Sequence, residues 1–197
     1  MGQRIIGLTG GIATGKSTVS QYLQTVHQLP VLDADRYARQ AVAPGSPVLA
    51  AIVHRYGDTM RQPDGTLNRL RLGELVFNQP AEKTWLEQQI HPLVRQCFRA
   101  AMADLSQAPV VVQVIPLLFE AGLTDQVTEI WVVACDPAQQ LQRLMARNHL
   151  TPEQAQARIQ SQMPLGEKIA RADVILENTT DLPTLFRQVD EALQKGP

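Results

Sequence analysis

A glycine-rich stretch near the start of the chain ends in a lysine and a serine, GGIATGKS at residues 10–17. The spacing Gly10-x-x-x-x-Gly15-Lys16-Ser17 matches the phosphate-binding loop of nucleoside-triphosphate enzymes. Glycines let the chain curl so that successive amides face an anion, and a following helix adds its positive dipole end. In this pattern Lys16 reaches the β- and γ-phosphates, and the Ser17 hydroxyl ligates Mg²⁺. The residues expected to contact the triphosphate are Gly10, Gly11, Ile12, Ala13, Thr14, Gly15, Lys16, Ser17 and Thr18.

Two aspartates, Asp33 and Asp35, close the short apolar stretch Val31-Leu32 further along the chain. In an open parallel sheet the ligand crevice lies at the carboxyl ends of the strands, so we expect this pair on the same rim as the loop. A carboxylate there can accept a proton from an attacking hydroxyl or hold Mg²⁺ through water. Two residues apart on a strand, both carboxylates could face one way. The alternative is that they cap a helix before Arg36.

Arginines form a third group late in the sequence. Arg143 and Arg147 are four residues apart and share one helix face, and Arg158 follows the break at Thr151-Pro152. Arginines carried by a closing lid stabilise the charge that phosphoryl transfer spreads over the γ-oxygens, and closure excludes water. Taken alone, such arginines fit a solvated helix face better, but the glycine-rich loop reverses that preference and favours the catalytic interpretation.

Several classes of protein are disfavoured. A GTPase switch needs D-x-x-G and N-K-x-D, and the sequence contains neither. The formal net charge of −1 argues against a general nucleic-acid binder. A kinase acting on a small molecule therefore fits best. The alternatives are a kinase for a nucleoside monophosphate or a sugar acid, and a regulatory or assembly ATPase that hydrolyses slowly while contacting a partner protein.

Strand-like and helix-like segments alternate along most of the chain. This alternation predicts an α/β fold with a mostly parallel five-stranded sheet covered by helices on both faces, the three-layer P-loop NTPase architecture. Between Arg36 and Asp104 the recurrent patterns are all helical, which indicates a helical insertion. The expected strands are 4–9, 31–32, 110–115, 129–134 and 173–176, and the expected helices are 16–27, 50–56, 69–77, 81–103, 137–148, one from Thr151, and one from Asp181 to near Lys195-Gly196.

Bulk composition sets the class and the compartment. The 197 residues are 44% hydrophobic, which is typical of a globular protein with one substantial core. Cys97 and Cys135 are the only cysteines and have no metal spacing, so we expect reduced thiols in a cytoplasmic protein. No apolar run reaches the length of a membrane helix, and the start of the chain does not resemble a signal peptide. We expect neither membrane nor nucleic-acid partners.

Five motifs in this order resemble the dephospho-CoA kinase family and span nearly the whole chain. The glycine-rich loop alone is shared by many families, whereas PLLFE together with DAD and HP is far more specific. The motifs are LTGGIATGKST at 8–18, DADRYARQ at 33–40, HP at 91–92, PLLFE at 116–120 and ADVILEN at 172–178.

The resemblance implies transfer of the ATP γ-phosphoryl group to the 3′-hydroxyl of dephospho-CoA, the last step of coenzyme A synthesis, with Mg²⁺. It also implies three parts within a single 1–197 domain. Separately, we expect a monomer or weak homo-oligomer. These parts are a nucleotide-binding core at 1–35, 105–142 and 164–197, a helical insertion for the acceptor at 36–104, and a lid at 143–163.

The resemblance assigns roles to single residues. Asp35 matches the general base, and Asp33 matches its neighbour near the metal. Arg143 matches a lid arginine that faces the phosphates, and Arg147 follows it. Arg39 matches an arginine on the acceptor side.

Two further residues complete the expected site, and two positions depart from the family pattern. The segment from Asn178 resembles the stretch that lies against the ATP adenine. His91 is a candidate polar contact for the acceptor, or else part of a helix-breaking His-Pro pair with its imidazole satisfied in the core. Many family members carry Asp where Val114 stands, so the metal would depend on Ser17, Asp33 and water. Glu177 replaces another common Asp.

Overall fold

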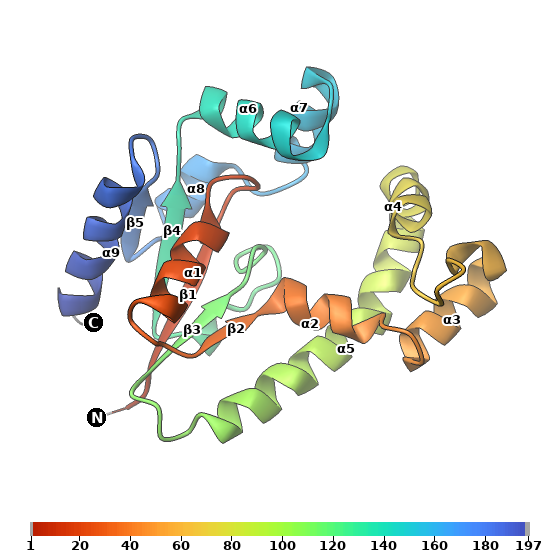
Figure 1. Ribbon diagram of the computed structural model, residues 1–197, viewed down its shortest axis with the longest axis horizontal. Helices are drawn as coiled ribbons and strands as arrows, with labels where there is room; N and C mark the ends of the chain where they lie inside the picture. The colour runs from red at the N-terminus through yellow and green to blue at the C-terminus, as the bar shows by residue number, and fades with distance from the viewer. Residues whose placement is uncertain (1, 196–197) are drawn as a thin grey trace. The chain divides into compact units, whose positions relative to one another are not determined.

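The computed structural model describes residues 2–195, and the chain divides into two compact units (Figure 1). The first unit holds the residues up to Asp33 and those from Leu105 onward, and the second holds Ala34–Asp104. Each unit has its own cluster of buried apolar side chains. Each is therefore a structural entity with its own core.

The first unit is built on a five-stranded sheet with strand order β2-β3-β1-β4-β5, and each pair of neighbouring strands in this sheet is parallel. β1 is central, since Leu8 lies between Val114 of β3 and Trp131 of β4. This confirms the predicted parallel α/β fold, and it places the glycine-rich loop at the end of the middle strand. The strands are β1 (Arg4–Gly10), β2 (Val31–Asp33), β3 (Val110–Val114), β4 (Glu129–Ala134) and β5 (Val174–Glu177).

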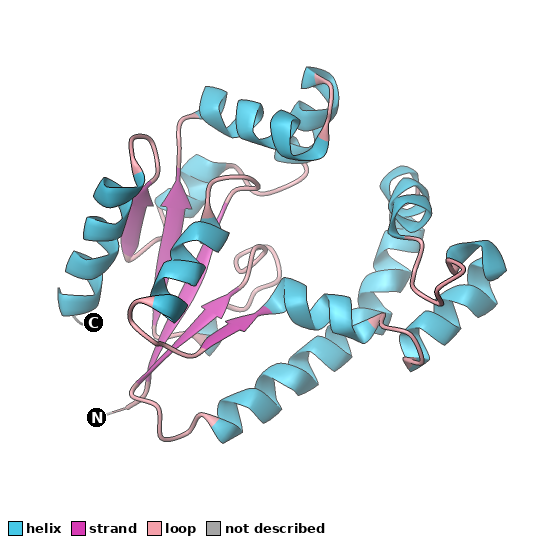
Figure 2. Ribbon diagram, viewed as in Figure 1, coloured by secondary structure: helices cyan, strands magenta, loops and turns pink. Residues whose placement is uncertain are grey.

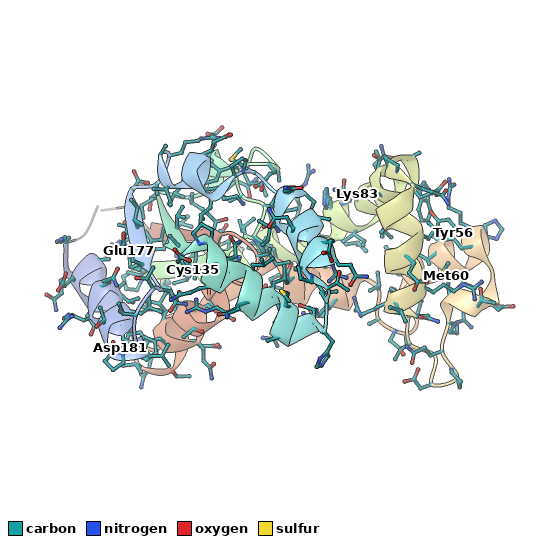
Figure 3. All side chains as sticks on the ribbon, turned by 90° about the horizontal axis from the view of Figure 1, so that it is seen from above. Tyr56, Met60, Lys83, Cys135, Glu177 and Asp181 are labelled. Atoms are coloured by element: carbon teal, nitrogen blue, oxygen red, sulfur yellow. The ribbon has the colours of Figure 1, made fainter. Side chains whose placement is uncertain are left out.

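Helices cover both faces of this sheet (Figure 2). α1 and α9 contact each other, and their buried side chains join Leu8 and Trp131 in the core. Seen from above in Figure 3, the light-blue α8 lies on the opposite side of the sheet from α1 and α9, in agreement with Figure 1. The helices are α1 (Lys16–Thr25), α6 (Pro137–Asn148), α7 (Pro152–Gln160), α8 (Leu165–Ile169) and α9 (Leu182–Lys195).

Side-chain caps fix where these helices begin. The Asp136 carboxylate accepts from two amides at the start of α6, and Thr151 forms a capping box with Gln154 at the start of α7. The Asp181 carboxylate accepts from the Thr184 amide at 2.8 Å and starts α9. These starts were predicted and are confirmed. The predicted end of the last helix near Gly196 lies outside the described residues.

The second unit is helical, as predicted. Its apolar core includes Leu49 and Ile52 of α3 together with Met60 and Leu67 from the segment that follows. Ser46 caps α3 by accepting from the Leu49 amide. The helices are α2 (Ala34–Ala41), α3 (Pro47–Tyr56), α4 (Arg69–Asn78) and α5 (Pro80–Asp104), with a short 3-10 turn at Asp58–Met60.

The expectation that Asp33 and Asp35 lie on one strand is wrong. β2 ends at Asp33 and α2 begins at Ala34, so Asp35 lies in the first turn of a helix. The segment ADRYARQA has good helix formers and an amphipathic pattern, and a carboxylate in the first turn favours the positive end of the helix dipole. These preferences prevail because β2 is only three residues long.

Two smaller differences concern α5 and α8. The His91-Pro92 pair does not break its helix, because α5 continues through Pro92 to Asp104. The five-residue α8 was not predicted. Long as α5 is, no helix within residues 2–195 combines the length and apolarity needed to cross a bilayer.

Candidate nucleotide site and acceptor-side residues

The phosphate-binding loop, Gly10–Ser17, joins the end of β1 to the start of α1. Its curl comes from three residues with positive φ, which are Gly10 at 147°, Ala13 at 60° and Gly15 at 107°. Glycine adopts such angles readily, and Ala13 is a strained exception. Strain of this kind persists only where the surroundings hold the backbone in place.

Glycine at position 15 is required by a neighbouring side chain as well as by its backbone angle. A Cβ on Gly15 would lie 2.2 Å from Nδ2 of Asn178. That nitrogen donates to the Thr14 carbonyl at 2.8 Å, and Asn178 is only 7% exposed. Asn178 follows β5 at the carboxyl edge of the sheet, so its buried amide supports the loop from a segment far away in sequence.

Two glutamine side chains hold the loop at a second point. Nε2 of Gln140 donates to the Ile12 carbonyl at 2.8 Å, and Oε1 of Gln162 accepts from the Ile12 amide at 2.9 Å. Gln140 is on α6 and is 5% exposed, while Gln162 follows α7. The loop is therefore fixed in its curled form by side chains from three different segments.

The start of α1 is open to an anion. Gly15 stands at the N-cap with no side-chain cap, and the first turn holds no acidic residue. Lys16 directs Nζ back over the loop, where it donates to the carbonyls of Gly10 at 3.1 Å and Gly11 at 2.6 Å. Loop curvature, the helix dipole and one lysine thus favour negative charge at a single place.

Arg143 adds a second cation at this end of the sheet. Its Nη2 donates to the Asn178 carbonyl at 3.1 Å, and its buried Nη1 has no partner among the described residues. Burial raises the pKa of the Cys135 thiol, while the charges of Arg143 and Lys16 act on that thiol in the opposite direction. Both cations therefore lie near Cys135, and a buried guanidinium N–H without an acceptor suits an anionic ligand.

The other arginines of the predicted lid face solvent. Arg147 is exposed and donates from Nε to Oδ1 of the adjacent Asn148 at 2.9 Å. Arg158, on α7, is also exposed. Of the three arginines singled out in the sequence, Arg143 is the one held against the loop supports.

Candidate magnesium donors are few. Ser17 is exposed at the start of α1, and Asp33 ends β2 beside Val114 of β3. Within the part of the chain that the structure describes, no group of three His, Cys, Asp or Glu side chains is placed to hold a metal ion. Mg²⁺ in phosphoryl-transfer sites usually keeps waters and phosphate oxygens and takes one or two protein ligands. A serine hydroxyl and one carboxylate fit that pattern.

The sequence did not indicate a buried ion pair beside the carboxyl edge of the sheet. Lys168 on α8 is fully buried, and its Nζ lies 2.8 Å from Oε1 of Glu120 and donates to the Pro116 carbonyl at 3.1 Å. The Glu120 carboxylate also accepts from the Met163 amide at 3.0 Å. This pair ties the segment after α7 to the turn after β3. The PLLFE motif drew attention to Glu120, whereas no pattern in the LGEKI sequence of α8 singles out Lys168.

In the second unit, Asp35 and Arg39 lie four residues apart on α2, so they share one helix face, and both are exposed. His91 is exposed on α5, which rules out an imidazole buried in the core. The structure thus gathers the loop, Lys16, Arg143 and Asn178 in one unit, and it carries Asp35, Arg39 and His91 in the other.

Comparisons with known proteins agree on one family. A family model described as dephospho-CoA kinase matches residues 4–184. A protein of Trichormus variabilis named dephospho-CoA kinase is 60% identical over 193 residues, which cover 98% of each chain. A solved structure from Thermus thermophilus has a TM-score of 0.83 at 36% identity and covers 99% of this chain and 98% of its own. A dephospho-CoA kinase structure from Campylobacter jejuni has a TM-score of 0.71 at 28% identity, covering 97% and 96%. This chain belongs to the dephospho-CoA kinase family.

Proposed function

We propose that this chain transfers the γ-phosphoryl group of ATP to the 3′-hydroxyl of dephospho-CoA, giving coenzyme A and ADP. The observation that carries the proposal is the phosphate-binding loop, held in its curled form by Asn178, Gln140 and Gln162 at the uncapped start of α1. Family membership supports the choice of acceptor. The site is suited to a triphosphate, and the family indicates where its terminal phosphoryl group goes.

The residues divide the chemistry between the leaving and the attacking side. Lys16, Arg143 and Arg147 would stabilise charge on the γ-phosphoryl oxygens, with Arg147 supplied by movement of the lid at 143–163. Asp35 would orient the acceptor hydroxyl and take its proton as the new P–O bond forms and the bond to the β,γ-bridging oxygen breaks. Since the transition state is loose, that proton moves late.

Mg²⁺ would be held by the Ser17 hydroxyl, the Asp33 carboxylate, water and phosphate oxygens. When bound, it would neutralise charge on the β- and γ-phosphates. Asp33 lies at the end of β2, two strands from β1, and the side chain of its neighbour Val114 on β3 offers no oxygen. We therefore expect Asp33 to reach the metal through water.

The helical unit, expected from the sequence as 36–104, would bind the acceptor, with Arg39 and His91 among its contacts. The Asn178 side chain supports the phosphate-binding loop. The backbone that follows Asn178 would contact the adenine of ATP. We expect a cytoplasmic enzyme that works as a monomer or weak homo-oligomer. Neither Cys97 nor Cys135 forms a disulfide in the described chain, which is consistent with a reducing compartment.

A coupled ADP-release assay over a panel of acceptors tests the proposal. Dephospho-CoA should stimulate ADP release far above the rate with water alone, and nucleoside monophosphates, shikimate and other small alcohols should not. Mass spectrometry should show the added phosphate on the 3′-hydroxyl. Slow ADP release that no acceptor stimulates would instead identify a regulatory ATPase, and preference for another acceptor would identify a different kinase.

A further inference from the structure

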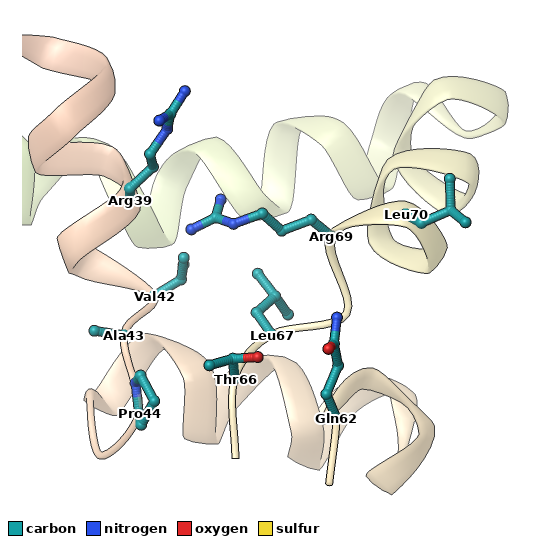
Figure 4. A pocket seen from close by; sticks show the side chains of 9 residues that line it. All are labelled: Arg39, Val42, Ala43, Pro44, Gln62, Thr66, Leu67, Arg69 and Leu70. Atoms are coloured by element: carbon teal, nitrogen blue, oxygen red, sulfur yellow. The ribbon is translucent and has the colours of Figure 1, made fainter. Parts of the chain in front are cut away.

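The helical unit holds a cavity that the assigned roles do not yet use. Its volume is about 430 Å³, within the range of roughly 300–1,000 Å³ typical of small-molecule sites. All of its walls come from the second unit, namely α2 and the segment after it, residues 62–67, and the start of α4. The cavity is lined by the polar side chains of Arg39, Gln62, Thr66 and Arg69 together with the buried Val42 and Leu67 (Figure 4). We call this space the arginine cavity.

Its two arginines are not paired with a carboxylate in the cavity wall. Among the described residues, neither Arg39 nor Arg69 has an ion pair or side-chain hydrogen bond, and none of the 9 lining residues is acidic. Arg55 of the same unit, by contrast, is paired with Glu82 at 2.8 Å. Figure 4 shows the Arg69 side chain extending from the start of α4 toward α2, which carries Arg39.

Such a cavity favours an anion with more than one oxygen. Guanidinium groups match phosphate geometry with two parallel N–H donors each, and two of them suit a diphosphate. The Thr66 hydroxyl and amide are already held by Asp64 at 2.6 and 2.9 Å, so Thr66 shapes the wall rather than supplying a free donor. The side-chain amide of Gln62 adds a neutral donor beside the two charges.

The positions of Asp35 and Arg39 along α2 indicate which diphosphate would bind in the cavity. Asp35 and Arg39 are separated by four residues, about 6 Å along the helix axis, on one face. If Asp35 meets the ribose 3′-hydroxyl, the 5′-substituent of the same ribose lies about one helical turn away. In dephospho-CoA that substituent is the diphosphate that joins adenosine to the pantetheine arm.

We propose that the arginine cavity binds the 5′-diphosphate of the acceptor, with Arg39 and Arg69 as the two contacts that select it. This inference rests on the proposed function and assigns Arg69 a role that sequence reasoning did not give it. Binding here distinguishes dephospho-CoA from adenosine, which presents the same hydroxyl without the diphosphate. The contacts are remote from the reacting atoms, so they set acceptor affinity more than the rate of transfer.

Steady-state kinetics of Arg39→Gln and Arg69→Gln test this, with Arg71→Gln as control because Arg71 is exposed on α4 outside the cavity. Each cavity variant should raise the KM for dephospho-CoA at least about tenfold, the scale of a lost charge-assisted hydrogen bond. The KM for ATP should stay within about twofold. Arg71→Gln should match the wild type, and Arg69→Lys should recover part of the loss.

A second acceptor separates the cavity from a general loss of folding. Adenosine should be a poor acceptor for the wild type, and the same variants should leave its kcat/KM unchanged within about twofold. If wild-type enzyme phosphorylates dephospho-CoA and the cavity variants keep its KM, the inference is wrong while the proposed function stands. If equal losses occur with both acceptors, the diphosphate assignment is wrong. If the wild type never phosphorylates dephospho-CoA, both fail.

Discussion

The phosphate-binding loop and the arginine cavity both suit anions, but they are built in opposite ways. The loop presents main chain, and buried amides of Asn178 and Gln140 hold it in shape. The cavity presents two exposed side chains, Arg39 and Arg69, with no ion pair among the described residues. The loop is therefore organised before its ligand arrives, whereas ordering the arginine side chains opposes part of the binding energy at the cavity.

The two sites are therefore sensitive to different substitutions. A preformed loop fails when its backbone cannot curl or its single lysine is removed. A side-chain site fails gradually, one hydrogen-bonding group at a time.

Lys16→Ala should have the largest effect, a loss of at least about 10³-fold in kcat/KM, because a cation that contacts developing charge is removed from a site of main-chain donors. Lys16→Arg should recover little, since its longer, forked group does not fit over the Gly10 and Gly11 carbonyls. Initial-rate kinetics would check this. Residual activity within tenfold of wild type would show that the γ-phosphate is held elsewhere.

Asp35→Asn should lower kcat by about 100-fold and leave the KM for ATP unchanged. The effect belongs at the lower end of general-base contributions, because a loose transition state needs little activation of the hydroxyl. Rapid-quench measurement of a single turnover isolates the chemical step. An ordinary transfer rate would remove Asp35 from the proton-accepting role.

Gly15→Ala should weaken ATP binding about tenfold, since the new Cβ would collide with Asn178 and the backbone angle is strained. Gly73→Ala is a matched control, because its Cβ meets nothing within 4 Å in an exposed part of α4. Isothermal titration of ATP compares the two. Equal affinity in both variants would mean that the loop is not held as described.

Lys168→Met should change stability more than turnover. Breaking the ion pair leaves Glu120 without its cation, at a cost of about 3 kcal/mol, near the low end for buried pairs because the Glu120 side chain is 23% exposed. Lys83→Met breaks an exposed pair with Glu87 and should cost no more than about 0.5 kcal/mol. Urea unfolding provides both values, and equal costs would contradict the assigned burial.

The smallest expected effect is the pH dependence of folding stability that comes from Glu120. Burial raises the pKa of Glu120, but hydrogen bonds from Lys168 and from the Met163 amide outweigh it and leave the pKa below its usual 4.5. A lowered folded pKa means stability that is present above pH 4.5 and lost as the pH falls through the folded value. Glu120→Gln should therefore be less stable than wild type at pH 7, with the difference shrinking below pH 4.5. A difference independent of pH would exclude ionised Glu120 as its source.

The sequence alone predicted the loop well and its supports poorly. A loop whose chemistry depends on glycine, lysine and serine at fixed spacing is visible in one short segment. Gln140 and Gln162, however, reach the loop from segments well over a hundred residues away, and no local pattern indicates a contact at that separation. The five strands were predicted because buried parallel strands are continuous apolar runs.

The helical unit was predicted only as a class. α2 was not predicted, because the short strand β2 and the two aspartates at its end resemble a strand that runs into a loop. The helix-forming residues of α2 begin directly after that strand. Arg69 drew no attention because one arginine at the start of a helix is an ordinary surface residue. Its significance comes from sharing a cavity wall with Arg39, which depends on how the chain folds between α2 and α4 and not on sequence spacing.

Equilibrium binding of each ligand alone to Gly15→Ala and Arg69→Gln tests the division between loop and cavity most directly. We predict that Gly15→Ala weakens ATP about tenfold and keeps the dephospho-CoA affinity of wild type, and that Arg69→Gln does the reverse. Weakened binding of both ligands by the same variant would contradict this division between loop and cavity. So would weakened ATP binding by Arg69→Gln with unchanged affinity for dephospho-CoA.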